Sequence, residues 1–407
     1  MTRDLDLVVH GASGYVGRLV ARAVAERAPR DLRWALSGRD AGRLHAVHRE
    51  LGLDARRVDV LVADAHDHTA LATLAGRTRT VLTTVGPYAR HGGPLVAACA
   101  LAGTDLADLT GEALWMRDTI DAHHVTARRS GARIVHACGF DSVPSDLGVL
   151  ALQRAALERH GRPCSEIVHL FGPLAGGVSG GTVASLFDLV DAGVRDPATR
   201  RKLADPDLLA PEGSRSAPSR VGVRPRRHDP PGVWSAPFLM AAMNEKVVRR
   251  TRALLGEPWG EAPRYLERLA APTWARAAAL GRGTALLPLA LSAKPVRRLA
   301  ARFLPRPGEG PSEQARERGF FRTTLIGRVP GVAEPIVGGT QADRDPGYGA
   351  TAPMLAEMGL LLAAGESDAP GGVLTPAVAG GERLIQRLAQ VGIRIEATDP
   401  ATAPAGR

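Results

Sequence analysis

The sequence predicts an α/β protein with a doubly wound parallel sheet and a second, mixed α+β domain inserted before the C-terminal helices. Three observations support this prediction. Strand-like and helix-like segments alternate over residues 1–145, a glycine-rich turn joins the first strand to the first helix, and the alternation stops after residue 145. Alternating strands and helices are typical of a parallel sheet that carries helices on both faces.

Six apolar segments in the first part of the chain have the length of buried strands. The expected strands are 5–10, 32–37, 58–62, 80–85, 104–108 and 133–138. Segments with helical periodicity separate them, at 15–28, 40–51, 68–76, 94–102 and 114–130. Six such strands suit the doubly wound Rossmann order 3-2-1-4-5-6, so residues 1–145 are expected to form one domain.

The rest of the chain is expected to form three further regions. Strand-like segments after residue 145 lack regular helical crossovers, which indicates a mixed α+β domain for substrate binding or dimerisation over 146–340. Residues 341–396 contain the helical segments 351–364 and 380–391, which are predicted to return to the first domain. Residues 397–407 have the composition of a flexible tail.

Composition excludes several classes of protein. Hydrophobic residues make up 44% and charged residues 23% of the 407 residues, which is ordinary for a folded globular chain. The three cysteines, Cys99, Cys138 and Cys164, are odd in number and form no CxxC pair, so neither a disulfide framework nor a metal site is expected. The sequence contains no signal peptide and no spanning apolar run, which favours the cytoplasm.

The turn after the first strand has the features of a phosphate-binding loop. Its three glycines follow the spacing GxxGxxG, a variant of the dinucleotide motif GxGxxG. Such glycines permit a tight turn, close approach of a pyrophosphate and close packing of the helix on the sheet, while N–H groups at the helix start bind phosphate. The predicted cofactor-binding residues are Gly11, Ala12, Ser13, Gly14, Tyr15, Val16 and Gly17.

The end of the second strand favours NADP(H) over NAD(H). An NAD site usually has a carboxylate there for the ribose 2′-hydroxyl. Here the sequence reads Ser37-Gly38-Arg39, and the Arg39 guanidinium suits a 2′-phosphate. The alternative is a solvated arginine at a helix start. Asp64 ends the third strand and is expected either at the adenine edge or as the cap of the next helix.

The candidate catalytic residues follow the fourth strand, because the carboxyl ends of the strands line the cofactor crevice of a doubly wound sheet. Gly86, Pro87 and Tyr88 are predicted to lie beside the nicotinamide ribose. Tyr88 and His91 are the candidate proton donors. The alternatives are that Tyr88 only stacks on the cofactor and that His91 only caps the next helix.

Polar residues also follow the fifth and sixth strands. Asp141 and Ser142 are predicted to hydrogen-bond the nicotinamide or the substrate, and Thr110-Gly111-Glu112 occupies the matching place after the fifth strand. The alternative is that Ser142 or Ser145 caps the helix that begins nearby.

Other familiar catalytic arrangements are absent from the sequence. None of the four tyrosines is followed by lysine four residues later, which excludes the Tyr-x-x-x-Lys pair of short-chain dehydrogenases. Neither a Ser-His-Asp set nor an HExxH motif is recognisable. Hydride transfer needs no such group, because the cofactor carries the chemistry.

Several longer stretches match the sequence pattern of a known protein family. They are GASGYVGR (11–18), SGR (37–39), VGPYARHGGPLVAACALAGTDLADLTGE (85–112), HACGFDSVPSDLG (136–148), DRDPGYGATAPMLAEMGLLL (343–362) and GGVLTPA (371–377). In these the chain resembles the saccharopine dehydrogenase-like oxidoreductases, and within them the trans-acting enoyl reductase branch. The resemblance spans nearly the whole chain and is weakest over 200–318.

The resemblance implies a Rossmann domain, an inserted second domain and a cleft between them. It also implies a stand-alone reductase that uses NADPH on an α,β-unsaturated thioester in lipid, glycolipid or polyketide biosynthesis. Two alternatives stay open. One is a saccharopine-type amino-acid dehydrogenase, which needs clustered basic groups for its substrate carboxylates. The other is a non-catalytic NADP-binding protein that associates with membranes.

A basic stretch over residues 268–308 bears on the partners of this chain, whose net charge is +10. It contains eight Lys or Arg and no Asp or Glu around an apolar core, 285–293. It suits the peripheral inner face of the plasma membrane, an acidic carrier protein that presents the acyl substrate, or a buried helix pair with solvated arginines. A homodimer is also open, whereas nucleic acid is not expected, because no binding motif accompanies the charge.

Overall fold

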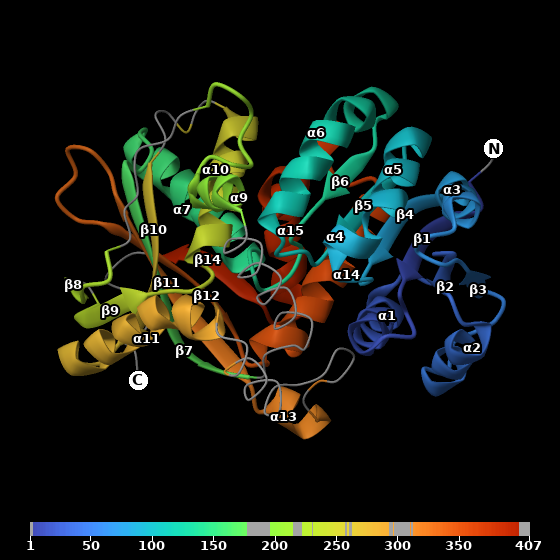
Figure 1. Cartoon of the computed structure of the whole chain (residues 1–407), viewed down its shortest axis with the longest axis horizontal. Coiled ribbons are helices and arrows are strands. Elements are labelled where there is room, and N and C mark those ends of the chain that lie inside the picture. Colours follow the sequence, from blue (N-terminus) through green and yellow to red (C-terminus); the bar gives the residue numbers. More distant parts are fainter. Residues whose placement is uncertain are drawn as a thin grey trace.

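Two seven-stranded sheets organise the chain (Figure 1). The computed structural model describes residues 3–176, 196–214, 222–229, 231–256, 263–292 and 312–398, together with Trp259, Val296 and Gly310. Figure 1 shows the first sheet with its helices on one side of the molecule and the second sheet on the other, with α7 and α15 between them. The predicted fold class, a Rossmann-like parallel sheet plus a second mixed sheet, is confirmed.

The first sheet is entirely parallel. Its order is β13-β6-β5-β4-β1-β2-β3, which contains the predicted order 3-2-1-4-5-6 and adds one strand from the C-terminal region. The strands are β1 (Leu5–His10), β2 (Trp34–Gly38), β3 (Val58–Val62), β4 (Thr78–Thr83), β5 (Asp105–Asp108), β6 (Arg133–Val135) and β13 (Gly372–Leu374).

Helices cover both faces of this sheet, and local signals set their ends. Asp40 caps its helix as predicted, since its side chain accepts a hydrogen bond from the Arg43 N–H. Gly103 and Gly131 end two helices in the left-handed conformation. The helices are α1 (Tyr15–Arg27), α2 (Ala41–Glu50), α3 (His68–Arg77), α4 (Tyr88–His91), α5 (Gly93–Ala102) and α6 (Ala113–Ser130).

The second sheet is mixed, with order β14-β12-β11-β7-β10-β9-β8. Only the β7–β10 pair is parallel among its described strand pairs. Its strands are β7 (Glu166–Ala175), β8 (Arg226–His228), β9 (Val233–Pro237), β10 (Arg264–Ala271), β11 (Phe320–Arg328), β12 (Ile336–Ala342) and β14 (Arg394–Thr398). Helices α7 (Val143–His160) and α10 (Ala241–Leu255) pack against its inner face. The expected domain boundary after residue 145 therefore falls inside α7.

The last part of the chain connects the two sheets. Strand β13 joins the first sheet and β14 joins the second, while α14 packs against α1 and α15. The remaining helical elements are α9 (Pro197–Ala204), α11 (Trp274–Ser292), α13 (Glu313–Glu317), η1 (Pro346–Ala350), α14 (Thr351–Ala363) and α15 (Pro376–Gln390). The predicted tail begins too early, because residues 397 and 398 pair with β12. Residues 399–407 lie outside the described part.

The basic stretch 268–308 is described up to residue 292 and at Val296. Its helix α11 leaves Trp274 and Leu286 more than half exposed, so this helix is not fully buried. Within the described residues, no helix has both the length and the apolar character needed to cross a bilayer. The rest of the stretch lies outside the described residues.

One buried carboxylate ties three helices together. Glu357 of α14 is fully buried and accepts hydrogen bonds of 2.9 Å from Arg27 of α1 and from Arg387 of α15. Because each partner is charged, each bond is worth more than a neutral one.

We expect Glu357→Gln to lower the free energy of unfolding by about 1.5–3 kcal/mol, because buried hydrogen bonds to charged groups are lost. Urea denaturation measures this change. The control is Glu382→Gln, whose exposed carboxylate pairs with Arg154 at 2.7 Å and should cost less than about 1 kcal/mol. Equal losses in the two variants would contradict a special role for Glu357.

Candidate functional site

The glycine turn brings α1 into close contact with the end of β1. Gly11 has φ +86°, and a Cβ added at Gly17 would lie 2.0 Å from the Gly11 carbonyl oxygen, so no side chain fits at that position. Gly14 is the exposed N-cap of α1 and has no side chain with which to cap the helix. The N–H groups of Val16 and Gly17, in the first turn of α1, have no intrahelical acceptor and are suited to an anion, as the sequence predicts for a pyrophosphate.

Tyr15 links this turn to the C-terminal region through its side chain. Its hydroxyl accepts a 2.5 Å hydrogen bond from Arg316, and its ring packs edge-on against Tyr348 at 4.9 Å. The side chain is therefore engaged with α13 and η1.

The prediction that the Ser37 side chain binds the cofactor is wrong. Its side chain is fully buried, and its hydroxyl lies 3.1 Å from Nδ1 of His10. Burial also lowers the pKa of His10 to about 4, so this imidazole is neutral at pH 7. The Ser37 hydroxyl is thus part of the sheet interior, where a phosphate cannot reach it. Arg39, two residues later, is exposed and has no ion pair with the described residues.

Asp64 lies at the end of β3 but does not cap α3. Its carboxylate accepts a 2.9 Å hydrogen bond from the His66 N–H, while Asp67 caps the helix by accepting from Thr69 and Ala70. The helix-cap alternative for Asp64 is therefore wrong, and its half-buried carboxylate holds the turn that leads into α3.

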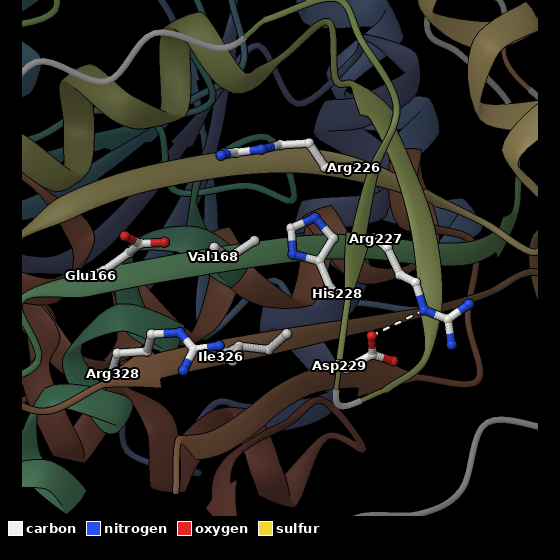
Figure 2. A pocket seen from close by; sticks show the side chains of 8 residues that line it. All are labelled: Glu166, Val168, Arg226, Arg227, His228, Asp229, Ile326 and Arg328. Carbon is white, nitrogen blue, oxygen red and sulfur yellow. Dashed lines mark hydrogen bonds and ion pairs between the residues drawn. The ribbon is translucent and has the colours of Figure 1, made fainter. Parts of the chain in front are cut away.

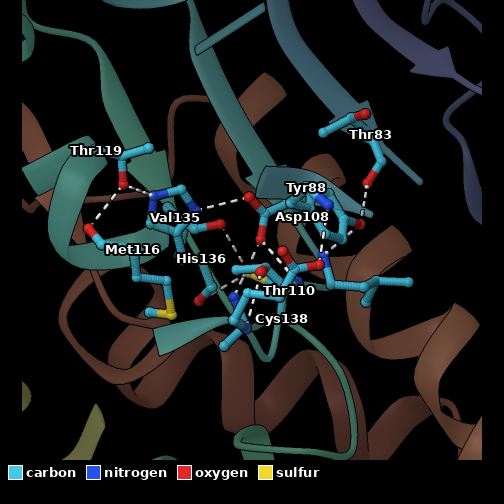
Figure 3. Close-up of polar contacts among 12 residues, drawn as sticks. Thr83, Tyr88, Asp108, Thr110, Met116, Thr119, Val135, His136 and Cys138 are labelled. Carbon is cyan, nitrogen blue, oxygen red and sulfur yellow. Dashed lines mark hydrogen bonds and ion pairs between the residues drawn. The ribbon is translucent and has the colours of Figure 1, made fainter. Parts of the chain in front are cut away.

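Tyr88 is buried below the turn after β4 (Figure 3). Its hydroxyl donates to the Thr83 carbonyl at 3.1 Å and accepts from the Leu109 N–H at 3.1 Å. Burial, with the nearby Asp108 carboxylate, raises the pKa of Tyr88 well above its ordinary value. Because its one proton is committed to the backbone, this geometry favours a positioning role over the predicted proton donation.

The turns after β4 and β5 are held together by Glu112. Its carboxylate oxygens accept from the N–H groups of Tyr88 at 2.9 Å and Ala89 at 2.8 Å, at the start of α4. Its own N–H donates to the Thr110 hydroxyl at 3.1 Å. Gly86 and Pro87 directly precede α4, at the carboxyl ends of the strands, where the sequence predicts the nicotinamide.

His91, at the end of α4, faces His66. Nδ1 of His91 lies 2.9 Å from Nε2 of His66, and the rings pack edge-on at 5.1 Å. The helix that follows has Gly92 at its N-cap with no side-chain bond, so the cap alternative for His91 is wrong. His91 stays a predicted proton donor on the exposed side of the turn.

A buried Asp–His pair that we did not predict joins the ends of β5 and β6 (Figure 3). Oδ2 of Asp108 lies 2.6 Å from Nδ1 of His136, whose Nε2 lies 2.9 Å from the Thr119 hydroxyl. Oδ1 of Asp108 accepts from the Thr110 and Ala137 N–H groups at 3.0 and 3.2 Å. Ala137 has φ +62°, a costly conformation for a residue other than glycine, and this pair holds it.

The turn after β6 separates two predicted site residues. Asp141 is half-buried and makes no hydrogen bond or ion pair with the described residues. Burial raises the pKa of Asp141 to about 6. Ser142 is fully buried, and its hydroxyl donates to Asn244 Oδ1 at 3.0 Å. Its side chain therefore points into the protein, and the prediction that it contacts the ligand is wrong. Ser142 is the N-cap of α7 by position, but its hydroxyl makes no cap bond.

Ser142 begins a hydrogen-bonded chain that crosses to the second sheet. Asn244 donates to Glu267 Oε2 at 2.9 Å, and the Tyr265 hydroxyl donates to Glu267 Oε1 at 2.5 Å. His169 Nδ1 lies 3.3 Å from the Tyr265 hydroxyl. Burial raises the pKa of Glu267 to about 7 and lowers that of His169 to about 3. Glu267 is therefore a buried carboxyl without a cationic partner among the described residues.

An aromatic cluster lies beside Asp141. Phe140, from the same turn, packs on Phe321 of β11 at 4.7 Å and on Phe171 of β7 at 6.2 Å. Phe171 stacks on Phe238 at 4.3 Å. Both sheets thus contribute to an apolar wall next to a half-buried carboxyl.

Comparison with known proteins identifies the family of this chain, although no family model matches it. A trans-acting enoyl reductase of Mycobacterium leprae is 38% identical over 97% of this chain and 98% of its own length. One of Mycobacterium bovis is 39% identical over 96% and 97%. The chain belongs to the trans-acting enoyl reductase family. A Mycobacterium tuberculosis protein that carries this name provisionally is 42% identical over 97% of the chain and 98% of its own length.

The fold of this family member is that of saccharopine dehydrogenase. The apo enzyme from Saccharomyces cerevisiae (L-Glu forming) aligns with a TM-score of 0.53 over 96% of this chain and 99% of its own, at 11% identity. The resemblance seen in the sequence is confirmed at both levels, and the protein is an oxidoreductase by family. In the described part of the chain, no cluster of His, Cys, Asp or Glu suits a metal ion.

The buried Glu267 carboxyl makes stability depend on pH. Since its pKa is raised on folding, the folded state holds a proton that the unfolded state releases, and the associated stability is lost as pH rises from about 4.5 to about 7. Asp146, with a pKa raised by burial to about 7, acts in the same direction. Ser145, Tyr265, Asn244 and the neutral His169 are the polar groups that face Glu267, and Glu245 is a nearby like charge, so no cation among the described residues compensates the Glu267 carboxylate.

We expect Glu267→Gln to become more stable relative to the wild type as pH rises from 5 to 7, by up to about 1.4 kcal/mol per pH unit. Urea denaturation at pH 5, 6, 7 and 8 measures the difference. The exposed variant Glu382→Gln should run parallel to the wild type. A pH-independent difference between Glu267→Gln and the wild type would show that Glu267 does not titrate in this range.

Proposed function

We propose that this protein transfers a hydride from NADPH to the β-carbon of an α,β-unsaturated thioester, whose acyl chain is presented on a carrier protein or on coenzyme A. The observation that carries this proposal is the close approach of α1 to β1 at the glycine turn. Gly17 has no room for a side chain, Gly14 has none with which to cap the helix, and the N–H groups of Val16 and Gly17 lie in the first helical turn, where a phosphate ligand binds. Family membership supports enoyl reduction as the reaction.

The residues at the end of β2 fit the 2′-phosphate of NADPH. Arg39 is exposed and without an ion pair among the described residues, so its guanidinium can receive a phosphate without losing an existing partner. The buried Ser37 takes no part in this contact, which makes Arg39 the residue on which the choice between NADPH and NADH depends.

The turns at the carboxyl ends of the first sheet favour a substrate whose reacting group is apolar and uncharged. The turns 84–87, 109–112 and 139–142 contain the carboxyls Glu112 and Asp141 and no arginine or lysine. An amino-acid substrate with several carboxylates would need cations at such an edge. Phe140, which is half-buried against the core residues Phe171 and Phe321, is the apolar group that we propose for contact with an acyl chain.

Asp141 is the residue we propose for proton delivery. Reduction of the double bond adds hydride at the β-carbon and a proton at the α-carbon, which gives the saturated thioester and NADP⁺. A half-buried carboxyl with a pKa near 6 is protonated often enough to supply that proton and regains it from water. Glu112 is already engaged with Tyr88 and Ala89, whereas Asp141 is not.

Removing the guanidinium of Arg39 tests the cofactor. We expect Arg39→Ala to weaken NADPH binding about 10–100-fold, as for loss of a charge-assisted contact of about 1.5–3 kcal/mol. NADH binding should stay within twofold of the wild type. Fluorescence titration with each cofactor measures this, and Arg49→Ala, an exposed arginine of the same helix α2, is the control. Equal loss for NADPH and NADH would refute the role of Arg39.

Asp141→Asn tests the proton donor. We expect kcat on an enoyl thioester to fall about 10²–10⁴-fold, because general acid catalysis is lost, while NADPH binding is unchanged. In the wild type, kcat should fall as pH rises above about 6, where Asp141 ionises. Asp118→Asn, on the exposed side of α6, is the matched control.

Tyr88→Phe should keep its kcat within a few-fold of the wild type while losing stability. A large kcat loss in Tyr88→Phe with full activity in Asp141→Asn would reverse the assignment.

A further inference from the structure

A polar pocket lies on the second sheet, on the face turned away from α7. Leu325 of β11 faces α7, since a Cβ at Gly148 would lie 3.1 Å from it. The neighbouring Ile326 therefore points to the opposite face, where it helps to line a cavity of about 180 Å³. Figure 2 shows the lining residues, which come from β7, β11 and the β8 hairpin: Glu166, Val168, Arg226, Arg227, His228, Asp229, Ile326 and Arg328.

The charges in this pocket do not cancel. Asp229 pairs with Arg227 at 3.0 Å, and Glu166 pairs with Arg264 at 3.8 Å. Arg226 and Arg328 have no ion pair with the described residues. In Figure 2, Arg226 reaches across the sheet from the hairpin and Arg328 lies on the other side of Val168. Two guanidinium groups that make no ion pair with the described residues thus flank one small cavity, which Glu166, the cross-strand neighbour of Arg328, and Asp229 also line.

His228 adds a neutral imidazole to the lining of the pocket. Its Nε2 lies 2.8 Å from the Ser235 hydroxyl, which accepts from Arg268 Nε at 2.7 Å. Burial and the adjacent Arg268 lower the pKa of His228 to about 4, so the ring is neutral at pH 7. Nε2 is thus engaged with Ser235, while Nδ1 makes no hydrogen bond with the described residues.

The wall of the pocket is preorganised by Arg268. This buried guanidinium donates to the carbonyls of Gly222, Arg224 and Ser235 at 2.8–3.1 Å and so fixes the segment that leads into β8 and its hairpin partner β9. A ligand that binds between Arg226 and Arg328 meets side chains anchored on ordered strands, which reduces the entropy lost on binding.

We propose that this pocket is a binding site for a phosphate group, carried either by a soluble phosphate ester or by a lipid headgroup. Planar guanidinium groups from two sides match the oxygens of a phosphate. Glu166 is placed to accept a hydrogen bond from a hydroxyl of the ester. The site lies apart from the glycine turn and does not depend on the proposed reduction.

The first test is binding of inorganic phosphate to the full chain at constant ionic strength, with chloride as the reference anion. We expect phosphate to raise the Tm of the wild type and to bind by calorimetry. Arg226→Gln and Arg328→Gln should each weaken binding at least tenfold. Arg276→Gln, on the exposed side of α11, should not. Absence of phosphate binding in the wild type, or equal weakening in all three variants, would overturn the proposal.

The second test distinguishes the sources of the phosphate. Vesicles of phosphatidylcholine alone and of phosphatidylcholine with phosphatidylglycerol are sedimented with the wild type and the same variants. Binding to the anionic vesicles that is lost in Arg226→Gln and Arg328→Gln assigns the site to a headgroup. Phosphate binding without vesicle binding assigns it to a soluble ester. Vesicle binding that survives in both variants, together with no effect on phosphate binding, contradicts the site.

Discussion

The close approach of α1 to β1 at the glycine turn is the contact on which the functional account depends. With only 2.0 Å between a Cβ at Gly17 and the Gly11 oxygen, any side chain would push the helix away from the sheet. The helix start would then move away from the crevice at the carboxyl ends of the strands. In the reaction that we propose, the hydride donor is held at that edge, and this contact would determine where its phosphates lie.

The same edge is organised by carboxylates with different partners. Glu112 joins the turns after β4 and β5, and Asp108 joins the ends of β5 and β6 through His136. Both are engaged by N–H donors and act as parts of the scaffold. Asp141 lies in the next turn and accepts no hydrogen bond from the described residues, and its raised pKa follows from burial. This difference is why we propose Asp141, and neither of the other two carboxyls, as the proton donor.

Features that depend on neighbouring residues in the chain could be predicted from the sequence. The glycine turn, the Asp40 cap and the strand order 3-2-1-4-5-6 follow from local patterns and from alternation. Ser37 was misassigned because its burial depends on His10, on the adjacent strand. The partners of Ser142 were not predictable either, since Asn244 is 102 residues away and no periodicity connects them. Strands β13 and β14 are three and five residues long and pair with distant strands, so their patterns were too short to recognise.

The most direct test of the central claim is isotope transfer from NADPH deuterated at the nicotinamide C4 to a short enoyl thioester, followed by mass spectrometry of the product. We expect one deuterium at the β-carbon with labelled NADPH in water. We also expect one deuterium at the α-carbon with unlabelled NADPH in D₂O. Absence of label at the β-carbon in a product that is nonetheless reduced, or consumption of NADPH without a saturated thioester, would contradict it.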